Sequence, residues 1–186
     1  RALGVEAAAA HQAKVAACLA DESWVVRTLA CELVQELPPS PAGKTALLQV
    51  VGDLDADVRS EALRALGKYG EDADDCVKTI IEVVRDEGVL KVRTSALWVL
   101  GQLSLEVVKP FIEDFDLALY HKDPRFRLTA VEALANLGPE MIIKRKDHLD
   151  SLSGMDMDEK VKEAAAAALK ALEQPDEDVT SPRSSI

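Results

Sequence analysis

Apolar and basic positions along the chain return in a regular pattern. Each unit has an apolar residue, a basic residue, an alanine three positions later and then a further apolar pair. The five units begin at Val25, Asp57, Lys91, Arg125 and Lys160, and read VVRTLACELV, DVRSEALRAL, KVRTSALWVL, RFRLTAVEAL and KVKEAAAAAL. Their basic residues are Arg27, Arg59, Arg93, Arg127 and Lys162, with separations 59−27=32, 93−59=34, 127−93=34 and 162−127=35. This spacing predicts five structural repeats.

Within a unit, the apolar residues occupy one face of a helix. Val58, Ala62, Ala65, Leu66 and Tyr69 fall at i, i+4, i+7, i+8 and i+11, which is the periodicity of an amphipathic α-helix. The third and fourth units repeat the spacing, with Val92, Ala96, Val99, Leu100 and Leu103, and with Phe126, Ala130, Ala133, Leu134 and Leu137. The small alanine at the second of these positions allows a neighbouring helix to approach closely.

A second, less regular helix is predicted before each of these segments. The predicted ranges are 6–19, 42–51, 74–84, 105–119 and 140–152. Pro110 lies inside one of them and predicts a kink or a late helix start. Glycines follow several of the regular helices, as expected where a helix ends; they are Gly67, Gly70, Gly101 and Gly138. Acidic residues precede the regular helices, where a carboxylate caps free N–H groups; they are Asp21, Asp53, Asp55, Glu87, Asp123, Asp156 and Asp158.

The Val-Arg segments with acidic turns before them resemble the HEAT family, including its subgroup first noted in phycobilin lyase subunits. The resemblance covers residues 1 to about 172. It implies an all-α fold, a right-handed α-solenoid of about five HEAT-like helix-pair repeats. A partial repeat is expected at the N-terminus, because Arg1 to Gly4 match Arg64 to Gly67. We therefore expect the solenoid at residues 1–172 and a C-terminal tail at 173–186, acidic with Ser and Pro and no apolar period.

The resemblance also implies a role for the repeated basic residues. In HEAT proteins this arginine commonly bonds to an acid in the turn of its own or an adjacent repeat, forming a ladder. By position the role falls to Arg27, Arg59, Arg93 and Arg127, and to Lys162, which lacks the two-pronged guanidinium. The fourth turn carries His121 where the others carry an acid, and Asp123 is the expected substitute.

A partner is expected on the second helix of each repeat, since solenoids commonly bind along that surface. Counting from the apolar residue before the arginine, positions 3, 6 and 10 lie opposite the core. They include Leu29, Arg64, Trp98 and Glu132, our candidate protein-binding residues, and also Ser95 and Thr129. Two interpretations of Trp98 are open. It is either an exposed anchor for a partner, with Leu29 and Arg64 beside it, or it packs against an adjacent repeat or the kinked helix around Pro110. In the last unit Ala164 to Ala168 form a smooth face, which suggests that another element covers it.

Composition narrows the possible partners and the compartment. The formal net charge is −11 and the pI about 4.8, so phosphate backbones would be repelled and nucleic-acid binding is not expected. No apolar run of about twenty residues is present, so membrane insertion is not expected. Three cysteines, Cys18, Cys31 and Cys76, form no metal motif. They are expected as buried thiols in a reducing compartment, so we expect an intracellular, cytoplasmic protein.

The sequence contains little that indicates catalysis. His11, His121 and His148 are isolated from other metal-binding residues, and no phosphate-binding loop or nucleophile motif occurs. We therefore expect no catalytic residues, no metal and no cofactor. The leading hypothesis is a non-catalytic scaffold or assembly subunit that binds another protein or protein complex. The alternative is a HEAT-like subunit of a cofactor-handling enzyme, such as a bilin lyase-type chaperone, which would need a closed pocket with several aromatic groups.

Overall fold

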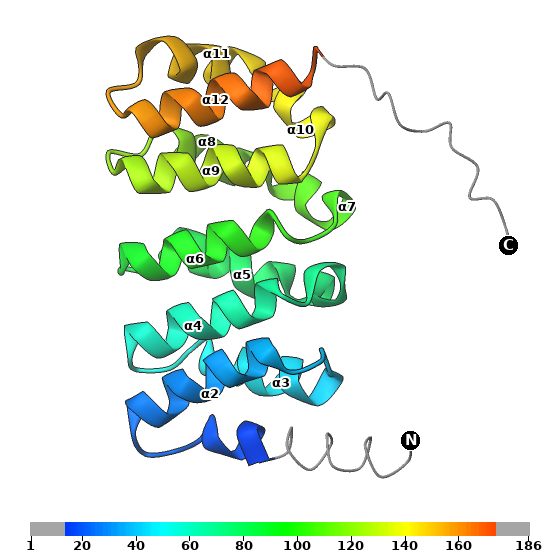
Figure 1. The fold of residues 1–186 in the computed structure, drawn as a ribbon, viewed down its shortest axis with the longest axis vertical. Coiled ribbons are helices and arrows are strands. Elements are labelled where there is room, and N and C mark those ends of the chain that lie inside the picture. The colour runs from blue at the N-terminus through cyan, green and yellow to red at the C-terminus, as the bar shows by residue number, and fades with distance from the viewer. Residues whose placement is uncertain (1–13, 174–186) are drawn as a thin grey trace, which may run out of the picture.

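The computed structural model describes residues 14–173, and its regular structure is helical throughout this range (Figure 1). The expected partial repeat at residues 1–4 and the tail beyond residue 173 lie outside the described residues. Within them the fold is an α-solenoid of helix pairs, which confirms the all-α class. No helix in the described part of the chain is long and apolar enough to cross a membrane.

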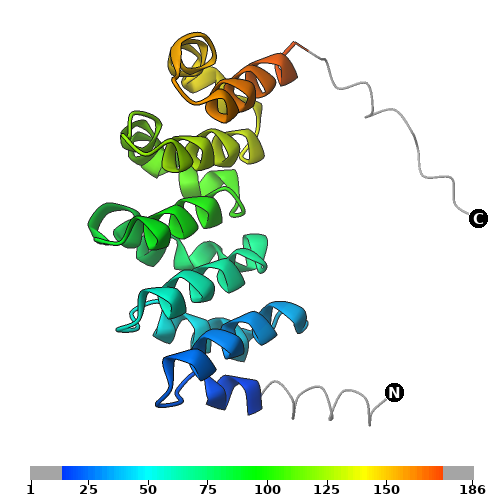
Figure 2. The same cartoon turned by 60° about the vertical axis from the view of Figure 1, so that its left-hand side comes forward.

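The repeated Val-Arg segments form the second helix of each pair. These helices are α2 (Trp24–Glu36), α4 (Ala56–Gly67), α6 (Leu90–Leu100), α9 (Pro124–Asn136) and α12 (Glu159–Ala171). Each contacts the next, so that they stack into one continuous row. This row faces the viewer in Figure 1, and the turned view in Figure 2 shows the same succession of layers.

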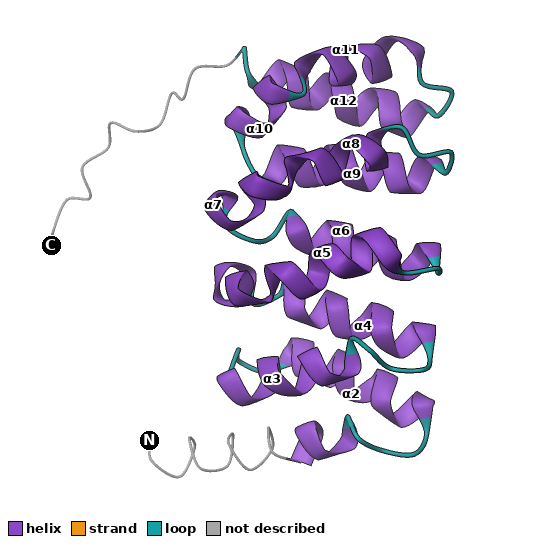
Figure 3. Ribbon diagram, turned by 180° about the vertical axis from the view of Figure 1, so that it is seen from behind, coloured by secondary structure: helices purple, strands orange, loops and turns teal. Residues whose placement is uncertain are grey.

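The first helices lie behind this row, as Figure 3 shows from the opposite side. They include α3 (Pro41–Val50), α5 (Val77–Asp86), α8 (Ile112–Leu119) and α11 (Lys146–Met155), and residues 14–18 are also helical. The apolar faces of the two rows meet in one core. Leu66, Leu100 and Leu134 from the second helices and Ile80 and Phe115 from the first are fully buried. The helix periodicity of the sequence therefore places the core between the rows and leaves the outer side of each row to solvent.

Several first helices are shorter than the sequence predicts. The predicted helix at 105–119 divides into α7 (Leu105–Val108), a 3₁₀ turn η2 (Lys109–Phe111) and α8, which confirms the break expected at Pro110. Proline has no N–H for the helix ladder, and its ring obstructs the preceding turn. The predicted helix at 140–152 also divides, into α10 (Pro139–Lys144) and α11. A 3₁₀ helix, η1 (Gly70–Cys76), precedes α5, so the α-helix begins at Val77 rather than at Asp74.

Aspartates begin three of the second helices. Asp55 accepts hydrogen bonds from the N–H groups of Asp57 and Val58, at 2.9 and 3.3 Å. Asp123 and Asp158 occupy the same position before α9 and α12. A carboxylate there satisfies N–H groups that have no partner inside the helix and interacts favourably with the helix dipole. These caps fix where each second helix starts and hence the register of its exposed face.

Candidate protein-binding face

Three arginines tie successive repeats together along the turns. Arg27 contacts Asp53 with Nε–Oδ2 and Nη2–Oδ1 distances of 2.6 and 2.8 Å. Arg59 binds Glu87 at 2.7 and 3.0 Å, and the two bonds from Arg127 to Asp156 are 2.7 and 2.6 Å. Each acid belongs to the turn of the following repeat. These two-pronged pairs therefore hold neighbouring repeats in a fixed relation.

Each of these arginines also binds the turn of its own repeat. Nη1 of Arg127, for example, donates to the backbone oxygens of His121 and Lys122 at 2.7 and 3.2 Å. The guanidinium groups hold the pKa of Asp53, Glu87 and Asp156 below its ordinary value, mainly through these side-chain hydrogen bonds. The carboxylates are therefore more easily ionised in the folded state than in the unfolded chain, which ties the ladder to acid stability.

Arg93 and Lys162 depart from the expected ladder. Nε of Arg93 donates to the backbone oxygen of Val84 at 2.8 Å, and its guanidinium lies 4.9 Å from the ring centre of Phe126. The expected substitute acid, Asp123, instead binds Arg125 at 2.8 Å. Lys162 pairs with Glu159 on its own helix at 3.1 Å. The position opposite Arg93 is His121, which offers no carboxylate, so within the described range the ladder is interrupted at the fourth turn.

The four candidate binding residues lie on the second helices α2, α4, α6 and α9. Leu29 is 50% exposed. The side chain of Arg64 is 59% exposed. Glu132 is also exposed, whereas Trp98 is only partly so. A side chain at Gly67 would collide with the indole of Trp98, so the ring lies directly on the backbone of α4. Packing against the adjacent repeat thus accounts for one side of Trp98, and part of the residue is left exposed.

Two positions assigned to the free surface are buried instead. Ser95 and Thr129 are each only 9% exposed. The hydroxyl of Ser95 lies 2.9 Å from that of Ser60 on α4, and Thr129 donates to the backbone oxygen of Arg125 at 2.9 Å. The expectation was wrong because position 3 of each second helix faces the preceding second helix, which the pattern of a single helix does not reveal.

Sequence reasoning also missed an exposed apolar stripe on α2. Trp24, Val25 and Leu33 are about half exposed, as is Leu29. Leu33 corresponds to Ala65 and Val99, which are fully buried in the next two repeats. In those repeats the second helix, α4 or α6, packs against a preceding second helix, α2 or α4. Only a comparison of repeat positions combined with the stacking order could have identified this stripe.

A hollow of about 250 Å³ opens on the outer side of the second-helix row. It is lined by Ser60, Arg64, Leu90, Lys91, Thr94, Ser95 and Arg125, which come from α4, α6 and α9. We call it the cationic hollow. Lys91 pairs with Asp57 at 2.6 Å and Arg64 with Glu61 at 3.6 Å. A wider hollow of about 580 Å³ lies at the turns, where Tyr120, Met155 and Met157 are exposed and line it.

The sequence matches the family of HEAT repeats over residues 12–101 and 46–117. The chain belongs to the HEAT-repeat family. Its sequence has no match among curated proteins. This membership agrees with the resemblance carried by the Val-Arg segments and with the stacked helix pairs.

Solved structures with a similar fold include three helical repeat proteins. In the complex of CpcE and CpcF of phycocyanin lyase from a Nostoc species, the matching chain has a TM-score of 0.67 and 16% identity; the match covers 87% of this chain and 99% of that one. A designed armadillo repeat protein has a TM-score of 0.61 and 21% identity, covering 85% and 80%. YibA of Escherichia coli has a TM-score of 0.67 and 16% identity, covering 89% and 60%. At these identities the likeness establishes the fold alone.

Proposed function

We propose that this HEAT-repeat protein is a non-catalytic scaffold that binds another protein or protein complex on its second-helix row. The observation that carries the proposal is the alignment of Arg64, Trp98 and Glu132 at the same position of α4, α6 and α9. Because these helices stack in order, the three side chains form a line along the solenoid. A partner segment that runs along the stack would meet a cation, an aromatic ring and an acid in succession.

Trp98 is suited to anchor such a segment because its ring is held in place. The indole rests on Gly67, so little side-chain freedom is left to lose when a partner binds. Tryptophan is also among the residue types most often found at the energetic centre of protein interfaces. Arg64 and Glu132 on either side would supply charged contacts that favour one orientation of the partner.

The cofactor-handling alternative finds its support in the fold shared with the phycocyanin lyase complex. A cofactor-binding subunit would need a closed pocket in which several aromatic and polar groups converge. The aromatic residues that line the hollow at the turns are only Tyr120 and His121. Visible absorbance of the purified protein distinguishes the two functions, since a copurifying chromophore would favour the alternative.

Affinity capture with matched charge reversals tests the scaffold proposal. Glu132→Lys changes the second-helix row, whereas Glu82→Lys makes the same change on α5, at an exposed residue of the first-helix row. We expect the wild type and Glu82→Lys to capture the same partner proteins, and Glu132→Lys to lose them. Equal retention by all three proteins, or equal loss from both variants, would exclude the second-helix row as the binding face.

A further inference from the structure

The cationic hollow differs in charge from the rest of this acidic protein. The sequence has 33 acidic and 22 basic residues, yet the hollow is lined by three cations, three hydroxyl residues and one leucine, with no acid among them. The hollow at the turns, in contrast, is lined by Asp156 and Asp158. A further hollow beside Arg27 is lined by Asp21 and Asp53. The lining therefore has a surplus of cations, and each of the three is paired with an acid outside the lining: Glu61, Asp57 or Asp123.

The three cations keep hydrogen-bond donors that could bind a ligand. Arg125 donates to Asp123 through Nε and Nη2, which leaves its other terminal nitrogen. The ammonium of Lys91 donates to Asp57 and has three N–H groups. Arg64 contacts Glu61 only as an ion pair, at 3.6 Å. All three side chains are more than half exposed, and such exposed ion pairs contribute little stability, so a new anion can compete for these cations.

The floor of the hollow adds a polar group at a defined place. The hydroxyls of Ser60 and Ser95 lie 2.9 Å apart and are buried. When Ser60 donates to Ser95, the proton of Ser95 is left to donate toward the hollow. A carboxylate oxygen entering between Arg64 and Lys91 would then find a neutral donor below it and charged donors at its sides.

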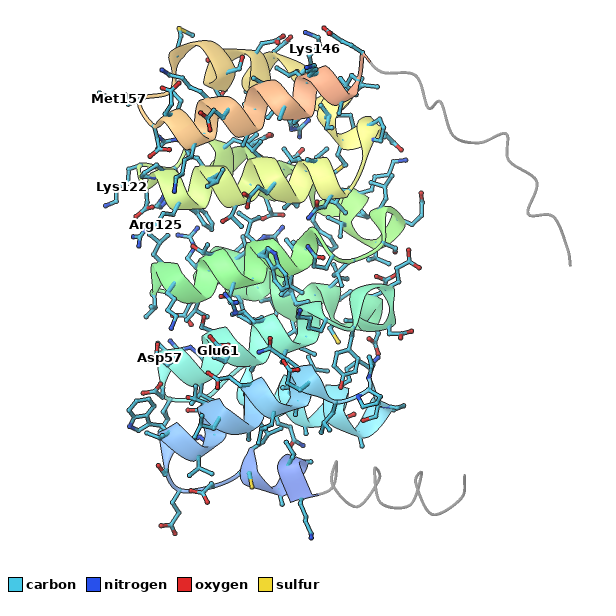
Figure 4. All side chains as sticks on the ribbon, in the orientation of Figure 1. Asp57, Glu61, Lys122, Arg125, Lys146 and Met157 are labelled. Atoms are coloured by element: carbon cyan, nitrogen blue, oxygen red, sulfur yellow. The ribbon has the colours of Figure 1, made fainter. Side chains whose placement is uncertain are left out.

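The spacing of the cations matches an extended chain better than a single small anion. Arg64, Lys91 and Arg125 come from three successive second helices, and packed helices lie about 8–10 Å apart. Three residues of an extended chain span about 10 Å. Figure 4 shows Arg125 near the start of α9, on the side of the molecule where Asp57 and Glu61 of α4 also lie. Lys91 and Arg125 lie in the first turns of α6 and α9, and Arg64 lies in the last turn of α4, so a segment that meets all three cations would cross the row obliquely.

We propose that the cationic hollow binds acidic side chains of an extended segment of the protein partner. This inference rests on the proposed function, because the hollow lies on the same row of helices. Trp98 follows Ser95 by three residues, which places it on the same face one turn further along α6. The partner motif would therefore combine two or three Asp or Glu residues with an apolar residue that packs against the indole.

Fluorescence anisotropy with a fluorescein-labelled octaglutamate peptide tests the hollow directly. The variant Arg64→Ala/Arg125→Ala removes two lining cations, whereas Lys78→Ala/Lys170→Ala removes two exposed lysines elsewhere. We expect the wild type to bind the peptide and the first variant to bind at least about tenfold more weakly. The control should change by less than about twofold, and binding should weaken as salt rises, because salt screens exposed charges. Thermal melting of each variant checks that it is folded.

Three results would overturn the inference. They are no binding of octaglutamate by the wild type, equal weakening in both variants, or tighter binding of a single-stranded oligonucleotide through Arg64 and Arg125. Partner capture separates this inference from the scaffold proposal. If capture is lost in Glu132→Lys but unchanged in Lys91→Ala/Arg125→Ala, which changes only lining residues outside the line of Arg64, Trp98 and Glu132, the second-helix row binds the partner and the hollow does not.

Discussion

The interrupted ladder can be repaired with one substitution, His121→Asp. His121 occupies the turn position that Asp53, Glu87 and Asp156 hold in other repeats. In those turns the acid also accepts the N–H two residues later, as Asp53 does from Asp55 at 2.8 Å. Nδ1 of His121 accepts the corresponding N–H of Asp123 at 3.0 Å. An aspartate can therefore keep the turn bond and offer its other oxygen to Arg93, which now binds Val84 instead.

The expected gain follows from the intact rungs and from the contact that is lost. In the Arg127–Asp156 pair the side chains are 14% and 3% exposed. Exposed pairs contribute up to about 1 kcal/mol, and breaking a buried pair costs about 3–5 kcal/mol, so a partly buried new rung should contribute about 1–2 kcal/mol. The variant loses the edge contact between His121 and Phe126, whose ring centres lie 4.9 Å apart. Such a contact contributes about 0.5–1 kcal/mol. The net gain should be about 0–1.5 kcal/mol, with a middle value of about 0.75 kcal/mol, which raises Tm by roughly 1.5–3 °C.

A double-mutant cycle measured by urea unfolding tests this reasoning. Arg93→Met keeps an aliphatic chain over Phe126 and removes the charge. We expect His121→Asp to stabilise the wild type but not Arg93→Met, with a coupling free energy of about 1 kcal/mol or more. Coupling below about 0.3 kcal/mol would mean that no rung forms. The role assigned to the ladder at this turn would then be refuted.

Three further predictions concern acid stability, packing and thiol reactivity. Folding lowers the pKa of Asp53, Glu87 and Asp156. The stability that these pairs contribute is therefore present above the unfolded pKa of about 4 and is lost as pH falls through the lower folded values. The urea concentration at the unfolding midpoint should decrease when the pH is lowered below about 4, and it should decrease less steeply in Asp156→Asn. Gly101→Ala should destabilise the protein by about 1–3 kcal/mol, because the new Cβ would lie 2.7 Å from the Cα of Ala133. Gly154→Ala in α11 should not destabilise it, because a Cβ there meets no atom within 4 Å. Calorimetry measures the Tm of both variants, and an equal Tm would contradict this prediction. Iodoacetamide at pH 8 should modify exposed Cys18 first, because Cys31 and Cys76 are buried and burial raises the pKa of their thiols to about 12 and 11; mass spectrometry showing equal rates would contradict this.

The repeat pattern predicts features that depend on one helix and its turn. The core positions, the aspartate caps and the break at Pro110 all follow from periodicity and backbone chemistry within a single unit. Features that depend on contacts between repeats are predicted less well. Ser95 and Thr129 are buried by a neighbouring second helix, and the place of Trp98 depends on the absence of a side chain at Gly67 of the preceding repeat.

The candidate site shows the same division. Arg64 and Glu132, both at position 6, could be assigned to the outer side from helix geometry alone, whereas Leu29 occupies position 3, which is buried in α6 and α9. The cationic hollow could not, because Arg64, Lys91 and Arg125 are separated by 27 and 34 residues (91−64=27, 125−91=34) and meet only when three helices stack. The sequence indicates the break in the ladder at Arg93 because His121 stands where other turns carry an acid. Only the structure shows that the guanidinium of Arg93 lies over the ring of Phe126.

Site-specific photocrosslinking tests the central claim most directly. A photoreactive benzoylphenylalanine in place of Glu132 lies on the second-helix row, and one in place of Leu117, which is 72% exposed on α8, lies on the first-helix row. With a captured partner present, the account predicts crosslinks from position 132 and few or none from position 117. Crosslinks from position 117 with none from position 132 would contradict it.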